Sequence, residues 1–156
     1  MGVIELEVTR TVPAPVEDVF ARLADIEGHN AWMPRRGSIL RRTQQTSPGT
    51  TGLGSTYLDR TLLGPTPGEV VVFDPPSALG YHWWTRSHRG RLHVQGWPGY
   101  FLVPAPDGGT RVRHHARMET YGAYRVAGPV LRRIAVRERT ATVDALVRSF
   151  TEVTGG

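Results

Sequence analysis

Residues 129–153 read PVLRRIAVRERTATVDALVRSFTEV, and no other stretch constrains the architecture of this chain as strongly. After the leading proline, no glycine or proline interrupts it. Apolar side chains recur at spacings of three and four, as in an amphipathic helix, at Leu131, Ile134, Val143, Leu146, Val147, Phe150 and Val153. The opposite side is expected to face water, since it carries Arg132, Arg133, Arg137, Glu138, Arg139, Asp144 and Arg148. The sequence therefore predicts one long C-terminal helix that packs on another layer.

The chain before this helix has mostly the patterns of β-strands. Residues 3–12 alternate apolar and polar side chains, which is typical of a strand with one dry face. Six more strands are expected, over 38–43, 55–62, 69–73, 79–85, 91–103 and 110–120. Residues that favour turns separate them, among them Gly64-Pro65-Thr66-Pro67-Gly68. Because short turns join the strands, we expect an antiparallel meander.

Two short helices are predicted between the first two strands. Pro15 suits the first turn of one helix, and a second helical turn is expected over 25–32. The order of elements indicates an α+β fold: a curved seven-stranded antiparallel sheet, two short helices and one long C-terminal helix, in one domain over 1–156. A long helix on the concave side of such a sheet leaves room for a largely apolar cavity.

Composition excludes several classes of protein. Hydrophobic residues make up 39% of the chain and charged residues 21%, and no apolar run approaches the roughly 20 residues that span a bilayer. We expect a soluble chain without a membrane span and, because no secretory signal is visible, a cytoplasmic location. The chain has no cysteine, which excludes disulfides, thiolate metal sites and a cysteine nucleophile.

No cofactor and no metal are expected. His114 and His115 are adjacent in a predicted strand and so point to opposite faces. Neither a phosphate-binding loop nor a dinucleotide fingerprint is present. All 19 basic residues are arginine and the net charge is +5, but acidic residues lie between the arginines and no nucleic-acid motif accompanies them. A solvated surface is therefore favoured over a nucleic-acid footprint.

Five short segments stand in order along nearly the whole chain: VPAPVEDVF at 12–20, Trp32, GLGS at 52–55, residues 70–76, and GGTRV at 108–112. Together they resemble landmarks of the START-like, or SRPBCC, superfamily, and within it the polyketide cyclase/dehydrase and lipid-transport-like proteins. The resemblance implies a helix-grip fold with an apolar cavity beneath the C-terminal helix, and ligands such as lipids, polyketides, hormones or quinones. The superfamily shares no catalytic residue, so the fold alone assigns no reaction.

Aromatic and apolar side chains are the predicted wall of that cavity. Aromatic rings offer broad contact and can stack on a flat ligand. The predicted ligand-binding residues are Trp32, Tyr57, Tyr81, Trp83, Trp97, His114, Met118 and Ile134. Packing in the core is the alternative interpretation for any single one of them.

Two residues are candidates for acid–base chemistry. His114 shares a parity with Val112 and Ala116, so it points to the core or the cavity, where it could act as a general base, line the pocket or fill the core. Asp59 lies mid-strand, where aspartate is disfavoured. If Asp59 faces inward it needs a polar partner; the surface interpretation is favoured, and His93 is likewise expected to be exposed.

Three functions follow as hypotheses. The leading one is binding or transport of a small hydrophobic, ring-containing molecule, such as a lipid, a polyketide or a quinone. The second is a polyketide cyclase, aromatase or dehydratase that uses a pocket His, Asp or Tyr as acid or base, so whether the protein is an enzyme stays open. The third is a protein- or nucleic-acid-interaction module that uses the arginines. The oligomeric state, a homodimer included, also stays open.

Overall fold

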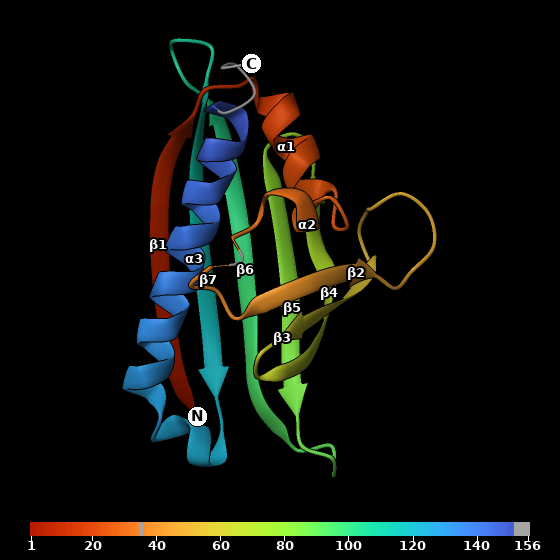
Figure 1. Cartoon of the computed structure of the whole chain (residues 1–156), viewed down its shortest axis with the longest axis vertical. Coiled ribbons are helices and arrows are strands. Elements are labelled where there is room, and N and C mark those ends of the chain that lie inside the picture. The colour runs from red at the N-terminus through yellow and green to blue at the C-terminus, as the bar shows by residue number, and fades with distance from the viewer. Residues whose placement is uncertain (35, 152–156) are drawn as a thin grey trace.

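The alternating segments form one antiparallel sheet in the computed structural model, which describes residues 1–34 and 36–151 (Figure 1). The strands are β1 (Gly2–Val12), β2 (Leu40–Gln45), β3 (Thr56–Thr61), β4 (Gly64–Asp74), β5 (Ala78–Arg86), β6 (Leu92–Pro104) and β7 (Thr110–Thr120). Their order in the sheet is β1-β7-β6-β5-β4-β3-β2, so each pair of consecutive strands from β2 to β7 lies side by side and β1 joins at β7. The predicted seven-stranded meander is confirmed.

The helices lie on one side of this sheet. They are α1 (Val16–Ala24), α2 (His29–Trp32), the 3-10 helix η1 (Gly122–Arg125) and the long α3 (Gly128–Thr151). Pro15 caps the start of α1, where its missing N–H is not needed. Figure 1 shows α3 running along β1 and β7, while β2 crosses in front of the central strands. The predicted end of the long helix at Val153 lies outside the described residues.

Two apolar clusters fix the layers to each other. One joins α1 and the C-terminal half of α3 to the middle of the sheet, through residues such as Phe20, Leu102 and Leu146. The other joins α3 to β1 and β7, through residues such as Leu6 and Val143. Burying a side chain of this size contributes about 1.5–3 kcal/mol, so α3 is held firmly over most of its length. None of the helices in the described part of the chain has the length and apolar character needed to cross a bilayer.

One predicted turn is part of a strand. Residues 64–68 begin β4, and the connection from β3 consists of Leu62 and Leu63 alone. Pro65 and Pro67 fit there because this part of β4 pairs with β3 alone, and its pairing with β5 starts at Gly68. A proline in a strand is tolerated where no neighbouring strand requires its N–H, so two prolines did not prevent the strand.

Two charged residues of α3 do not face water as the helical pattern predicts. Glu138 is 7% exposed, and its carboxylate accepts hydrogen bonds from the Ser38 hydroxyl at 2.6 Å and the Ile39 N–H at 2.9 Å. Arg139 is half-buried and lines a cavity. The prediction was wrong because the segment that leads into β2 crosses α3 and supplies polar partners to this part of the helix.

Candidate ligand-binding cavity

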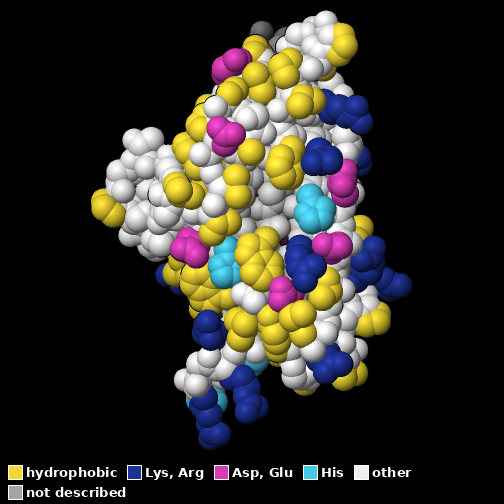
Figure 2. All heavy atoms as spheres, turned by 180° about the vertical axis from the view of Figure 1, so that it is seen from behind, with side chains coloured by type: hydrophobic (Ala, Val, Ile, Leu, Met, Phe, Trp, Pro, Cys, Tyr) yellow, Lys and Arg dark blue, Asp and Glu magenta, His cyan; other side chains and the backbone are white. Residues whose placement is uncertain are grey.

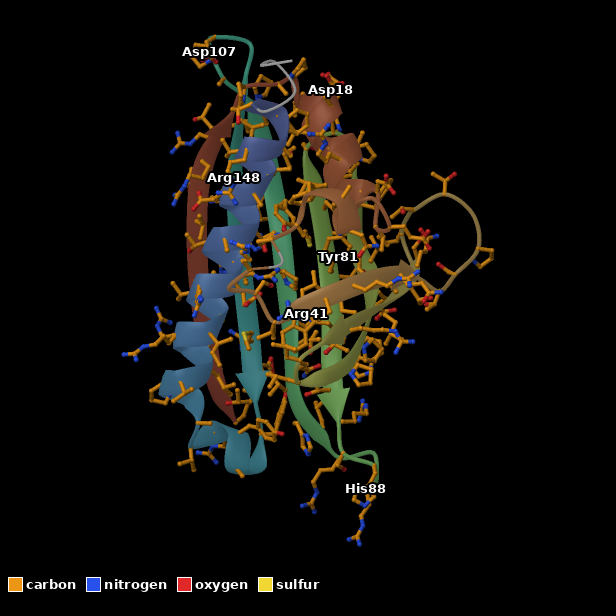
Figure 3. All side chains as sticks on the ribbon, viewed as in Figure 1. Asp18, Arg41, Tyr81, His88, Asp107 and Arg148 are labelled. Carbon is orange, nitrogen blue, oxygen red and sulfur yellow. The ribbon has the colours of Figure 1, made fainter. Side chains whose placement is uncertain are left out.

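A cavity of about 590 Å³ lies between the inner face of the sheet and the first half of α3. Its size is within the roughly 300–1,000 Å³ that small-molecule sites usually have. Elements far apart in the sequence line it, from α2 and β2 to η1 and α3. Figure 3 places one lining residue, Tyr81, near the centre of the molecule, whereas His88 and Asp107 lie at hairpin tips on opposite ends.

The apolar part of the lining comes from three elements. Trp83 on β5, Met118 on β7 and Ile134 on α3 all border the cavity. Gly96 on β6 lets the Trp83 ring lie across the neighbouring strand, because a Cβ at Gly96 would come within 2.6 Å of the indole. The result is a broad flat surface of the kind that suits a planar ligand.

Tyrosines form a second part of the lining. The rings of Tyr57 and Tyr81 meet edge to face, with centroids 5.5 Å apart. The Tyr81 hydroxyl donates a hydrogen bond to the Leu23 carbonyl at 2.8 Å, whereas those of Tyr57 and Tyr100 have no hydrogen-bond partner among the described residues. Burial raises the pKa of all three tyrosines, so each keeps its proton as a donor.

Asp59 lines the cavity, and the surface interpretation was wrong. Its carboxyl group is hydrogen-bonded to the side chain of Thr43, its cross-strand partner on β2. Burial raises the pKa of Asp59, while the Thr43 hydrogen bond and the charge of Arg139 oppose that rise. Strands β2 and β3 cover one side of the cavity, and Asp59 is on the face of β3 that points into it.

His114 points inward, as its strand pattern predicts, but it does not line the cavity. The ring is fully buried and stacks on that of Tyr100, with centroids 4.2 Å apart, and it is Tyr100 that borders the open space. The Nδ1–H donates to the Gly99 carbonyl at 2.8 Å, and Nε2 has no partner among the described residues. Burial lowers the pKa of His114 to about 3, so the ring is neutral. Its position favours the core interpretation.

Trp97 turns its ring away from the cavity. Trp97 is among the residues that border the cavity, but its indole stacks on His82, with centroids 4.9 Å apart, on the face of β5 opposite Tyr81 and Trp83. Figure 2 shows this outer face of the sheet, where hydrophobic, basic and acidic side chains and histidines are mixed. Sequence parity alone did not distinguish the two faces of this strand.

Trp32 also lies away from the cavity. It borders a second hollow, of about 550 Å³, that Arg22 and Arg148 line at the end of α3. Its ring meets that of His29 edge to face at 5.4 Å, and its indole N–H is buried without a partner among the described residues. Of the eight predicted ligand-binding residues, Tyr57, Tyr81, Trp83, Met118 and Ile134 have side chains placed to meet a ligand in the cavity.

The lining residues that were not among the predicted ligand-binding residues include Arg139, Tyr100 and His93. Arg139 follows Leu131 and Ala135 at four-residue spacing, so the three residues lie on one face of α3. This spacing could have predicted its position, but a charged residue was expected to face water. Tyr100 lines the cavity through the same inward parity of β6 as Val94. His93 lines it as well, because the pairing of β5 with β6 shifts there and the bulge changes the direction of its side chain.

In the residues that the structure describes, no group of three or more His, Cys, Asp or Glu side chains is placed to hold a metal ion. A family model described as "polyketide cyclase / dehydrase and lipid transport" matches residues 3–151. The chain belongs to this family. The match confirms the superfamily that the sequence landmarks indicate. No curated protein matches the chain.

Solved structures with the same fold include other members of the superfamily. A START superfamily protein from Mycobacterium smegmatis is 14% identical, covers 97% of this chain and 99% of its own, and has a TM-score of 0.72. The Zhui aromatase/cyclase from Streptomyces sp. R1128 is 15% identical, with coverage of 96% and 94% and a TM-score of 0.78. The di-domain ARO/CYC StfQ from the steffimycin biosynthetic pathway is 14% identical, with coverage of 99% and 52% and a TM-score of 0.73. At these identities the likeness shows the shared helix-grip fold alone.

Proposed function

We propose that this protein binds or carries a small hydrophobic, ring-containing molecule in the cavity beneath α3. The observation that supports this most directly is a space of about 590 Å³ whose wall combines Trp83, Met118 and Ile134 with tyrosine rings. Apolar concave sites with a few polar groups are the usual form of small-molecule sites. Polyketides and quinones fit this description because their rings are flat and carry oxygen atoms.

The route into the cavity is marked by lining residues that are also exposed. Leu63, in the turn between β3 and β4, is 73% exposed, and Tyr124 of η1 is 38% exposed. Arg86, at the end of β5, is exposed as well. We therefore propose that a ligand enters between the β3–β4 turn and η1.

Titration with the neutral fluorescent probe N-phenyl-1-naphthylamine tests the proposal. The probe's emission should rise on binding to the wild-type protein, and Ile134→Trp should abolish that rise because the larger ring fills the cavity. Val136→Trp is the matched control, since Val136 lies on the same helix, is 40% exposed and does not line the cavity. Met118→Trp provides a second blocked cavity on a different element. Equal binding by the wild type and both blocked variants, or no binding at all, would overturn the proposal.

A second function, that of a polyketide cyclase, aromatase or dehydratase, is favoured by Asp59. Cyclisation of a polyketone needs a base that removes a proton next to a carbonyl and an acid that protonates an oxygen, and loss of water needs an acid again. Burial raises the pKa of Asp59, which suits a carboxyl group that both takes up and returns a proton. The free hydroxyls of Tyr57 and Tyr100 lie in the same cavity.

Turnover of a linear polyketide by the Asp59→Asn variant tests this second function. We expect the variant to keep binding N-phenyl-1-naphthylamine and to lose turnover by about 10²-fold or more, which is the usual contribution of general acid–base catalysis. His114→Gln should retain turnover, because His114 does not border the cavity. Unchanged turnover in Asp59→Asn would remove Asp59 from this role and leave binding as the function.

A further inference from the structure

We propose that the ligand of this cavity carries an anionic oxygen, a carboxylate or an ionised phenol, which the guanidinium group of Arg139 binds. The inference rests on the proposed binding function, because it names the chemical class of the molecule that occupies the same space. It divides ring-containing ligands into two groups: acidic ones, which the cavity selects, and neutral ones such as sterols, which it does not.

Arg139 is a half-buried cation in the cavity wall, and its charge acts on the nearby Asp59. It lines the cavity from α3, and among the described residues it makes no hydrogen bond and no ion pair. An isolated charge in an interior is unfavourable unless a partner of opposite sign approaches it. Guanidinium offers several N–H donors in a plane, a geometry that matches a carboxylate.

The other two arginines that line the cavity already have hydrogen-bond or ion-pair partners. Arg86 donates to the Gly90 carbonyl at 3.0 Å. Arg117 forms ion pairs with Glu5 at 3.4 Å and Glu119 at 3.7 Å, outside the cavity. Among the described lining residues, Arg139 is therefore the guanidinium that is free to bind a ligand.

The two acidic side chains that line the described cavity form no ion pair with Arg139. Glu138 uses both carboxylate oxygens on the Ser38 hydroxyl and the Ile39 N–H. Asp59 forms no ion pair with Arg139 and is held by Thr43. Burial raises the pKa of Asp59, which reduces the negative charge that this group can set against Arg139.

Two hydroxyl donors complete the site. Tyr57 and Tyr100 line the cavity with hydroxyls that have no partner among the described residues, and the charge of Arg139 acts on both groups. An anionic oxygen near Arg139 would receive hydrogen bonds from the guanidinium and from these phenols. A neutral carbonyl could accept the same bonds but would not cancel the charge, so the site favours an anion.

A pair of probes tests the inference separately from the proposed function. 8-Anilinonaphthalene-1-sulfonate shares the anilinonaphthalene rings of N-phenyl-1-naphthylamine and adds one sulfonate. Arg139→Gln should weaken binding of the sulfonate probe about tenfold or more, which corresponds to the loss of a hydrogen bond to a charged group. The neutral probe should change by less than about twofold, because it makes no charged contact. Arg139→Lys should recover part of the affinity for the sulfonate, since it keeps the charge but not the planar donors.

Matched variants define the outcomes. Arg133→Gln removes an exposed charge from the same helix and should leave both probes unchanged. Asp59→Asn should tighten binding of the sulfonate, because it removes any negative charge that Asp59 still carries near Arg139. If neither probe binds the wild type, or the Ile134→Trp block has no effect, the binding function itself fails. If the neutral probe binds in the cavity but the sulfonate binds Arg139→Gln and Arg139→Met as tightly as the wild type, only the inference is overturned. Near-UV circular dichroism confirms that each variant is folded.

Discussion

Replacing Glu138 with alanine should destabilise the protein by about 3 kcal/mol. Glu138 is 7% exposed, and its carboxylate accepts hydrogen bonds from Ser38 at 2.6 Å and from Ile39 at 2.9 Å, which tie α3 to the segment before β2. A hydrogen bond to a charged group contributes about 1.5–3 kcal/mol, and a buried donor left without a partner costs a further part of that amount. We take the lower bound for the two bonds, because water from the adjacent cavity can reach the freed donors.

Urea unfolding, followed by circular dichroism, measures this change. With an unchanged m-value, the midpoint should fall, and the Tm should drop by roughly 6–12 °C for a domain of this size. Glu138→Gln keeps one acceptor and should lose only about half as much. Asp144→Ala is the control: its ion pair with Arg10 at 3.0 Å is partly exposed and should contribute less than about 1 kcal/mol. A loss below about 1 kcal/mol in Glu138→Ala, equal to that of the control, would refute the role assigned to this contact.

Three further predictions concern stability and the cavity wall. Burial lowers the pKa of His29 to about 4 and that of His114 to about 3, from an ordinary value of 6.5. Below pH 6.5 the unfolded chain therefore binds more protons than the native protein does. The free energy of unfolding should fall by roughly 2 kcal/mol per histidine between pH 7 and pH 5. Equal free energies of urea unfolding at the two pH values would contradict this. Gly96→Ala places a methyl group against Trp83 and should lower the free energy of unfolding by about 1–3 kcal/mol. It should also shift the tryptophan emission and weaken binding of N-phenyl-1-naphthylamine. An unchanged spectrum and affinity would show that the Trp83 ring does not lie against Gly96. Leu146→Ala, at a fully buried position, should lower the free energy of urea unfolding by about 2–5 kcal/mol and leave probe binding intact. A change near zero would mean that this part of α3 is loosely packed.

The fold could be predicted because periodicity reports burial directly. The apolar spacing of α3 and the alternation of β1 and β7 each require one dry face, and only a helix across a sheet satisfies all of them. Residues 64–68 escaped this reasoning. Their glycines and prolines have the composition of a turn, and pairing with β3 makes them part of a strand.

The cavity residues were harder to predict, because strand parity tells which residues share a face but not which face is buried. Asp59 was assigned to the surface for this reason although it lines the cavity, and parity did not show that the Trp97 ring stacks on His82. Glu138 and Arg139 raise a related difficulty. The partners of Glu138 are about 100 residues away in the sequence, and no local pattern of α3 records a contact that the segment before β2 makes.

A crystal structure of the protein with N-phenyl-1-naphthylamine tests the central claim most directly. The account predicts electron density for the probe's rings between α3 and the sheet, in contact with Trp83 and Ile134. An interior in which side chains interlock and leave no space for the probe would contradict the account, and so would rings bound only on the outer face of the sheet.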